Sequence, residues 1–281
     1  MTGHQFVAPP EIVYTRCPSH RIDKTGVVAV SLSFERYVDL IAASATRLIE
    51  TVEGAGFDAE VVTCPTWDGR ALVAHQAMVH RWAAAHVRGD DASAVPNQTQ
   101  IRESVDDLGS YFREGVDRLV TALGAAPDNV EALVFLNDAP RPKLFWARRQ
   151  AHETTVHMVD ALSAALGRVP TAAETAIEAD VAIDGIDELL CGFFTRGRSK
   201  IFDGTEYDVD VAPTDAGRRW TLHVAERMTT VADSDGDAPV RIAGSAQALY
   251  LALWNRGDEV EVSGDDRLLD RWRAAQRVRW S

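Results

Sequence analysis

The chain has 281 residues, of which 46% are hydrophobic and 25% charged, a balance typical of one large globular domain or two of ordinary size. Its net charge of −13 argues against nucleic acid or an anionic membrane as the main partner. Cys17, Cys64 and Cys191 are scattered, without a C-x-x-C pair, and no apolar run approaches the ~20 residues of a membrane-spanning helix. We therefore expect a cytoplasmic protein without disulfides.

The first residues of the chain differ from the rest. They lack the basic-then-apolar order of a signal peptide, and they lack helical periodicity. We therefore interpret residues 1–31 as an irregular N-terminal extension.

Residues 32–170 are expected to form a four-helix bundle. Four segments place apolar side chains at helical spacing, with capping residues before them and glycine after them. Ser33 and Asp68 are expected to cap the first two, and Pro142 suits the first turn of the last. The helices predicted are 33–56, 67–89, 101–124 and 142–167.

The remainder of the chain predicts a linking helix and a second domain. A helix at about Ala173–Phe194 is expected to fill most of the linker 171–200. After it come short alternating runs bounded by Asp, Gly and Pro, which are typical of strands. Residues 201–281 are therefore expected to form a small α/β domain, with helices near 245–257 and 265–276. The predicted fold class is α+β, a helical bundle followed by this smaller domain.

The fourth bundle helix contains "WARRQAHETTVHMVDAL", which is close to the H-E-x-x-H motif of zinc proteases but one residue longer. At 100° per residue, His152 and His157 point ~140° apart and do not easily share a metal, whereas Glu153 and His157 diverge by only ~40°. The E-x-x-x-H pair is therefore the part that suits a metal. Taken alone, this helix fits the simpler interpretation of a polar, solvated face.

The second helix supports the metal interpretation. His75 lies within its apolar stripe and should point into the bundle, whereas His80 lies ~140° away near the polar side, and His86 is ~16 Å further along. An inward histidine is more often a satisfied core residue than a ligand. Together with Glu153 and His157, however, it would leave one coordination position open, as in catalytic zinc sites or sites for iron(II).

Two segments also carry a family resemblance. "CPTWDGRALVAHQAMVHRWA" and "RRQAHETTVHMVDA" resemble the two motifs of the mycothiol-dependent maleylpyruvate isomerase family, C-P-x-W…L-V-x-H and A-H-E-x-x-x-H followed by Asp. The resemblance covers roughly residues 32–280. It implies a DinB-like metal-binding bundle and a sterol-carrier-like C-terminal domain.

The resemblance also implies site residues. It implies His75, Glu153 and His157 as ligands of a divalent metal, usually zinc, with the open position taken by water or by mycothiol, the low-molecular-weight thiol of actinobacteria. "LALWNRGDEVEVSGD" resembles the family's W-x-R segment, so Asn255 and Arg256 are candidates to reach the cleft and bind the cofactor.

Further roles follow from the residue types. Arg149 and Arg256 are candidate anchors for a substrate carboxylate. A surface ion pair or a helix C-cap is an equally plain interpretation of Arg256. Asp160, three residues after His157, is a candidate to support the metal site, and Cys64 is expected only to pack.

The function expected is that of a mycothiol-dependent isomerase or S-transferase, in which a metal-activated thiolate adds to a small electrophilic substrate. Two alternatives stay open: a metal- or small-molecule-binding protein without turnover, and a metal-dependent hydrolase of a thiol conjugate. We expect a monomer or homodimer that binds neither nucleic acid nor membrane.

Overall fold

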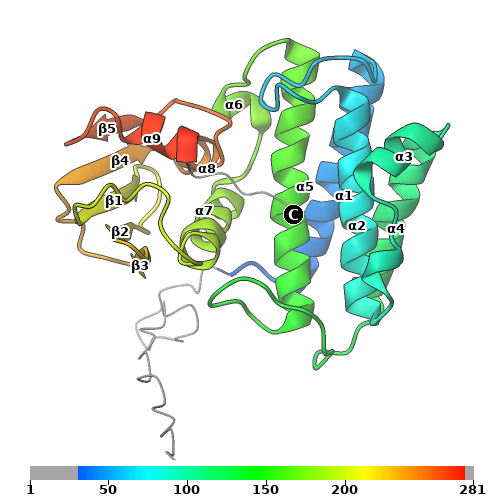
Figure 1. The fold of residues 1–281 in the computed structure, drawn as a ribbon, viewed down its shortest axis with the longest axis horizontal. Helices are drawn as coiled ribbons and strands as arrows, with labels where there is room; N and C mark the ends of the chain where they lie inside the picture. Colours follow the sequence, from blue (N-terminus) through cyan, green and yellow to red (C-terminus); the bar gives the residue numbers. More distant parts are fainter. Residues whose placement is uncertain (1–30, 276–281) are drawn as a thin grey trace, which may run out of the picture.

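The computed structural model describes residues 31–275, and Figure 1 shows a helical bundle beside a smaller domain built on a β-sheet. The predicted irregular extension falls, apart from Ser31, outside the described residues. Helix α7 lies between the bundle and the sheet (Figure 1). The α+β prediction is confirmed, while the domain boundaries at residues 170 and 200 stay a prediction.

The four long helices of the bundle begin and end close to where capping residues place them. Ser33 accepts a hydrogen bond from the backbone of Arg36, and Asp68 accepts one from Ala71 at 2.7 Å. Gly89 and Gly167 end their helices in the left-handed region. The helices are α1 (Phe34–Ala55), α2 (Gly69–Arg88), α4 (Leu108–Ala125) and α5 (Pro142–Leu166).

The third predicted helix, 101–124, was wrong as a single helix. The chain instead forms a short 3-10 turn η1 (Ala92–Ala94), then α3 (Gln98–Ser104), and begins α4 only at Leu108. Val105 has an extended backbone, and Asp107 caps the new helix by accepting from the backbone of Ser110 at 2.9 Å. Val105, the C-cap of α3, and Asp107, the N-cap of α4, therefore divide the apolar stripe between two helices.

The predicted linking helix Ala173–Phe194 is also divided. It consists of α6 (Ala172–Thr175), α7 (Ala179–Asp187) and the π-helical segment η2 (Glu188–Phe193). Ala176 has a φ of 53°, which ends α6, and Glu178 has an extended backbone at the N-cap of α7. The change to a π-helix at Glu188 had no counterpart in the periodicity.

The C-terminal domain is a five-stranded sheet in the order β3-β2-β1-β4-β5, in which β1 and β4 are parallel and the other neighbours antiparallel. Trp220 and Trp272 are buried in its core. The predicted strands and helices are confirmed as β1 (Tyr207–Pro213), β2 (Trp220–Val224), β3 (Thr229–Ala232), β4 (Val240–Gly244), α8 (Ala246–Leu253), β5 (Glu261–Ser263) and α9 (Leu268–Ala275).

Helix α5 occupies the middle of the molecule, between the bundle helices and α7 (Figure 1). Its polar stripe is therefore buried: Arg149, Asp160 and Trp146 are all 0% exposed. The interpretation of this stripe as a solvated face was wrong, because several elements cover it. Trp146 stacks on His86 of α2, Arg149 pairs with Glu188 of η2, and Asp160 pairs with Arg256 of the C-terminal domain.

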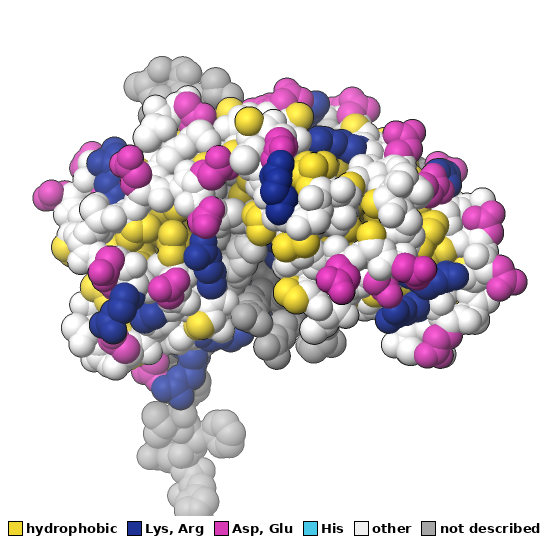
Figure 2. Space-filling view, turned by 90° about the horizontal axis from the view of Figure 1, so that it is seen from above, with side chains coloured by type: hydrophobic (Ala, Val, Ile, Leu, Met, Phe, Trp, Pro, Cys, Tyr) yellow, Lys and Arg dark blue, Asp and Glu magenta, His cyan; other side chains and the backbone are white. Residues whose placement is uncertain are grey.

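The exposed charges form a different pattern from those on α5. Figure 2 shows acidic and basic side chains interspersed over one face of the molecule. Between residues 31 and 275, no helix combines the length and the apolar character needed to cross a membrane.

Candidate metal centre

Three side chains from two helices meet in the bundle. Glu153 Oε1 lies 3.3 Å from His157 Nε2, one turn further along α5, and 3.5 Å from His75 Nε2, which comes from α2. All three residues are buried, and one ligand atom from each lies within 4.8 Å of the others. The predicted trio of metal ligands is thus brought together.

The atoms of this cluster fit a divalent metal ion. Nitrogen and oxygen ligands about 2.0–2.1 Å from a tetrahedral zinc ion lie roughly 3.3 Å from one another, close to two of the separations found. Within residues 31–275, His75 Nε2 and Glu153 Oε1 have no hydrogen-bond partner although both are buried. Buried polar atoms without partners are costly, and a cation held between these two atoms would satisfy both.

Asp160 lies one turn after His157 on α5 and orients its ring. Its Oδ2 accepts a hydrogen bond from His157 Nδ1 at 2.8 Å, which leaves Nε2 of that ring directed at Glu153. This is the carboxylate–histidine arrangement that commonly orients metal-binding imidazoles. Thr63 also donates to Asp160, at 2.5 Å.

Arg256 brings the C-terminal domain to this site. Its Nε and Nη2 donate to the two oxygens of Asp160 at 3.0 and 2.9 Å, and its Nη1 donates to the carbonyl of Trp254. Burial would raise the pKa of Asp160, but the guanidinium and the His157 ring lower it well below its usual range. The Asp160 side chain is 0% exposed and that of Arg256 only 16%, so the surface ion pair considered for Arg256 is not what the chain forms.

Trp67 covers the two histidines. Its ring lies 4.8 Å from that of His75 and stacks on that of His157 at 5.7 Å between centroids. The tryptophan is held in a tight loop, in which its backbone N–H donates to the carbonyl of Cys64 at 2.8 Å. This apolar cover limits access of water to the cluster.

Comparison with known proteins now decides the family. The family model for the mycothiol maleylpyruvate isomerase N-terminal domain matches residues 38–162, and the model for the C-terminal domain of the same family matches residues 180–271. The chain belongs to the mycothiol-dependent maleylpyruvate isomerase family. This is a family of enzymes, and the resemblance drawn from the sequence is confirmed.

Solved structures agree on the fold. A crystal structure of the mycothiol-dependent maleylpyruvate isomerase matches with a TM-score of 0.57 at 16% identity, covering 83% of this chain and 95% of the other. A mutant of that enzyme with one histidine changed to alanine matches with a TM-score of 0.56 at 15% identity, with the same coverage. The comparison with curated proteins found no match.

The other three histidines of α2 and α5 have partners outside the trio. His152 Nε2 contacts Asp184 Oδ2 at 2.7 Å, so it is a neighbour of the metal cluster, as its angle on the helix predicts. His80 is fully buried and contacts Thr154 at 2.9 Å, so its expected place near a polar surface was wrong. His86 stacks on Trp146.

Arg149 is placed behind Glu153. Its side chain is 0% exposed and donates from Nη2 to Glu153 Oε2 at 3.2 Å, while Nη1 pairs with Glu188. To bind a substrate carboxylate, it would have to leave these two partners. That role stays a prediction, as does the role of Asn255, whose backbone lies in the left-handed region at a φ of 62°.

Cys64 lies beside the supporting pair. Its Sγ is 3.6 Å from Asp160 Oδ2 and 3.3 Å from Arg256 Nη2. Burial, aided by the carboxylate, raises the pKa of the Cys64 thiol to about 12, so it stays protonated at neutral pH. A packing role is consistent with this environment.

Two residues near the candidate metal site were not predicted from the sequence. Trp67 stands within the quoted C-P-x-W motif, so its position next to a ligand helix was a usable signal. Glu188 gave no signal, because it contacts the site through Arg149, 39 residues earlier in the chain.

Proposed function

We propose that this protein is a mycothiol-dependent isomerase or S-transferase whose activity requires a divalent metal, most simply zinc, held by His75, Glu153 and His157. The proposal rests on one observation. In a buried site, two imidazole Nε2 atoms lie 3.5 and 3.3 Å from the same carboxylate oxygen. Family membership supports the thiol, because the matching models describe mycothiol maleylpyruvate isomerase domains.

A divalent metal held by His75, Glu153 and His157 would lower the pKa of a coordinated thiol, so that thiolate would be available at neutral pH. In a cis–trans isomerisation, the thiolate sulfur adds to one carbon of the activated double bond. Rotation about the resulting single bond and expulsion of the same thiolate give the trans product. The thiol is regenerated, and no oxidant or reductant is consumed. In an S-transferase, the adduct is released instead.

The protein's own residues prepare this chemistry. With His157 deprotonated by metal binding, two neutral histidines and one carboxylate would leave room for an exogenous ligand, as in catalytic rather than structural sites. Asp160 fixes the ring of His157, and Arg256 fixes Asp160. Trp67 shields the imidazoles. A dry, oriented site strengthens the electrostatic interactions made within it.

The first experiment is metal analysis of the purified protein by mass spectrometry, beside His157→Ala and the control His86→Ala. About one zinc per chain, retained in the control and lost in His157→Ala, would support the metal centre. Absence of metal after reconstitution with zinc or iron(II) would contradict it.

Activity assays then test whether the reaction requires mycothiol. Maleylpyruvate is the first substrate to assay, with and without mycothiol, and other small electrophiles follow. Turnover that requires mycothiol supports the proposal. Hydrolysis that proceeds without thiol would favour a metal-dependent hydrolase, and bound metal without any turnover would favour a binding protein.

A further inference from the structure

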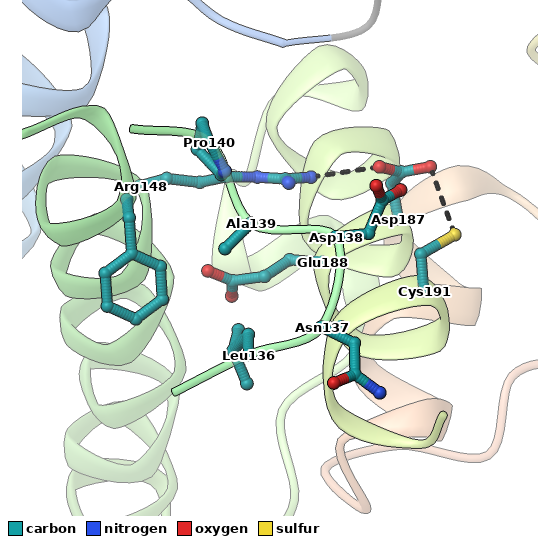
Figure 3. A pocket seen from close by; sticks show the side chains of 11 residues that line it. Leu136, Asn137, Asp138, Ala139, Pro140, Arg148, Asp187, Glu188 and Cys191 are labelled. Carbon is teal, nitrogen blue, oxygen red and sulfur yellow. Dashed lines mark hydrogen bonds and ion pairs between the residues drawn. The ribbon is translucent and has the colours of Figure 1, made fainter. Parts of the chain in front are cut away.

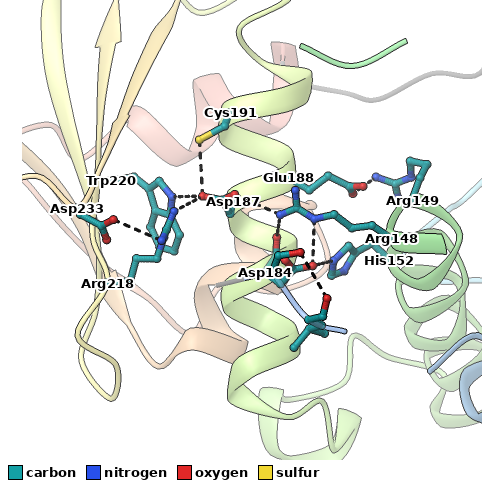
Figure 4. A network of polar contacts seen from close by, with 12 residues as sticks. Arg148, Arg149, His152, Asp184, Asp187, Glu188, Cys191, Arg218, Trp220 and Asp233 are labelled. Carbon is teal, nitrogen blue, oxygen red and sulfur yellow. Dashed lines mark hydrogen bonds and ion pairs between the residues drawn. The ribbon is translucent and has the colours of Figure 1, made fainter. Parts of the chain in front are cut away.

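Three buried charged side chains form two consecutive ion pairs, which begin at Glu153 of the candidate metal site and extend away from it. Glu188, Arg149 and Glu153 have side chains that are 2%, 0% and 4% exposed, and the arginine pairs with both carboxylates. Figure 4 shows the contact between Arg149 on α5 and Glu188 on the neighbouring helix. We propose that Glu188 is a positioning residue for the metal centre, acting through Arg149 on Glu153. This inference rests on the proposed metal centre, but not on the identity of thiol or substrate.

The two carboxylate oxygens of Glu153 face different partners. Arg149 Nη2 donates to Oε2 at 3.2 Å, whereas Oε1 lies 3.3 and 3.5 Å from the two imidazole nitrogens. With Oε2 engaged, the carboxylate presents one oxygen to the metal. A free carboxylate could turn and bind through both oxygens, which would occupy the position needed by a thiol.

Glu188 in turn holds Arg149. It accepts from Nη1, so the guanidinium is shared between two carboxylates. The rings of Phe193 and Trp254 lie 5.0 and 5.4 Å from the Arg149 Cζ atom and confine it further. Without the second carboxylate, the whole positive charge of Arg149 would be directed at Glu153 and would compete with a metal cation for it.

The π-helical segment explains how Glu188 reaches this place. Helix α7 ends at Asp187, and η2 begins at Glu188. Asp187 pairs with Arg218, Trp220 and Arg148, while Glu188 turns to Arg149 (Figure 4). Single π turns within helices often occur at functional sites.

The outer side of Glu188 is covered by the loop that precedes α5. Figure 3 shows Glu188 in a small pocket with Leu136, Ala139 and Pro140. The backbone N–H of Asn137 donates to the carbonyl of Gly192 at 3.4 Å, which ties this loop to η2. The cover limits access of water to the ion pair, so the charges are weakly screened.

The test compares Glu188→Gln with Asp187→Asn, its matched control. Both replace a buried, paired carboxylate by its amide at neighbouring positions, but Asp187 is not in contact with Arg149. In Glu188→Gln, we expect zinc affinity to fall roughly tenfold or more. The visible spectrum of the cobalt(II)-substituted protein should also change, because its intensity and position report coordination geometry. Asp187→Asn should lose thermal stability but keep the cobalt spectrum and the zinc affinity.

A cobalt spectrum and zinc affinity in Glu188→Gln equal to those of the wild type would overturn the inference, as would equal changes in both variants. If Glu188→Gln does not fold, Arg149→Lys replaces it, since it keeps the charge but loses the fork that joins two carboxylates. An unchanged cobalt spectrum there would also overturn the inference. Mycothiol-dependent turnover enters none of these comparisons, so failure of the proposed activity is distinguishable from failure of this inference.

Discussion

Arg256 and Asp160 join the two domains through a largely buried two-point ion pair, with nitrogen–oxygen distances of 3.0 and 2.9 Å. Asp160 is 0% exposed and also holds His157. The pair therefore links the position of the C-terminal domain to the orientation of the His157 imidazole, one of the three candidate metal ligands. Its partners are 96 residues apart in the chain.

Replacing Arg256 by methionine should be strongly destabilising. Removing one partner leaves the carboxylate of Asp160 buried without its cation, which typically costs about 3–5 kcal/mol. Urea denaturation followed by both tryptophan fluorescence and circular dichroism would measure the free energy of unfolding and show whether the two signals coincide.

The matched control is Arg113→Met, because Arg113 makes a similar two-point pair with Glu53 at the surface, where the two side chains are 48% and 37% exposed. This change should cost no more than about 1 kcal/mol. Equal losses in both variants would show that burial does not strengthen the Arg256 pair.

Asp160→Asn should weaken metal binding by roughly 10- to 100-fold, because the amide is a poorer acceptor for the Nδ1–H of His157 and does not fix that ring as firmly. Competition with a zinc-sensitive dye would measure the affinity. Asp184→Asn is the control, since this equally buried carboxylate contacts His152 at 2.7 Å but no member of the trio. The prediction fails if both variants bind zinc alike.

Metal binding should release about one proton per chain near neutral pH. Burial alone would lower the pKa of His157, but its hydrogen bond to Asp160 and the nearby carboxylate of Glu153 outweigh burial and raise it to about 9 in the metal-free protein. Burial lowers the pKa of His75, and the neighbouring histidines hold that of Glu153 well below its usual range against the opposing effect of burial. Only His157 therefore carries a proton that a metal must displace.

The sign of the pH dependence follows from this assignment. Zinc affinity should rise about tenfold per pH unit from about pH 7 until it levels off near pH 9. Titration calorimetry in buffers of different ionisation enthalpy measures both the affinity and the proton release. An affinity that does not change over this range would contradict the assignment to His157.

Cys64 should react slowly with alkylating agents and should not be required for metal binding. With the thiol pKa raised to about 12 by burial, little thiolate is present at pH 8, so labelling by iodoacetamide in the native protein should be slow compared with the unfolded protein. Cys64→Ala should retain its zinc. Rapid labelling, or loss of zinc in this variant, would assign Cys64 a larger role than packing.

The sequence alone determined the features that depend on local spacing. Caps and glycines placed the ends of α1, α2 and α5, and helical angles paired Glu153 with His157 while separating His152 from them. The apolar stripe of α2 directed His75 inward. Each of these follows from the fixed rotation per residue of a helix, which is a local property of the chain.

Only the tertiary structure decided what the polar face of α5 meets. Its residues fit a solvated surface until α2, η2 and the C-terminal domain cover them, and no local pattern reveals a partner that lies far along the chain. Arg256 reaches Asp160, and Glu188 reaches Arg149, only after α7, η2 and the sheet have packed against the bundle. Long-range ion pairs of this kind depend on packing, because a buried charge is stable only where folding supplies its partner.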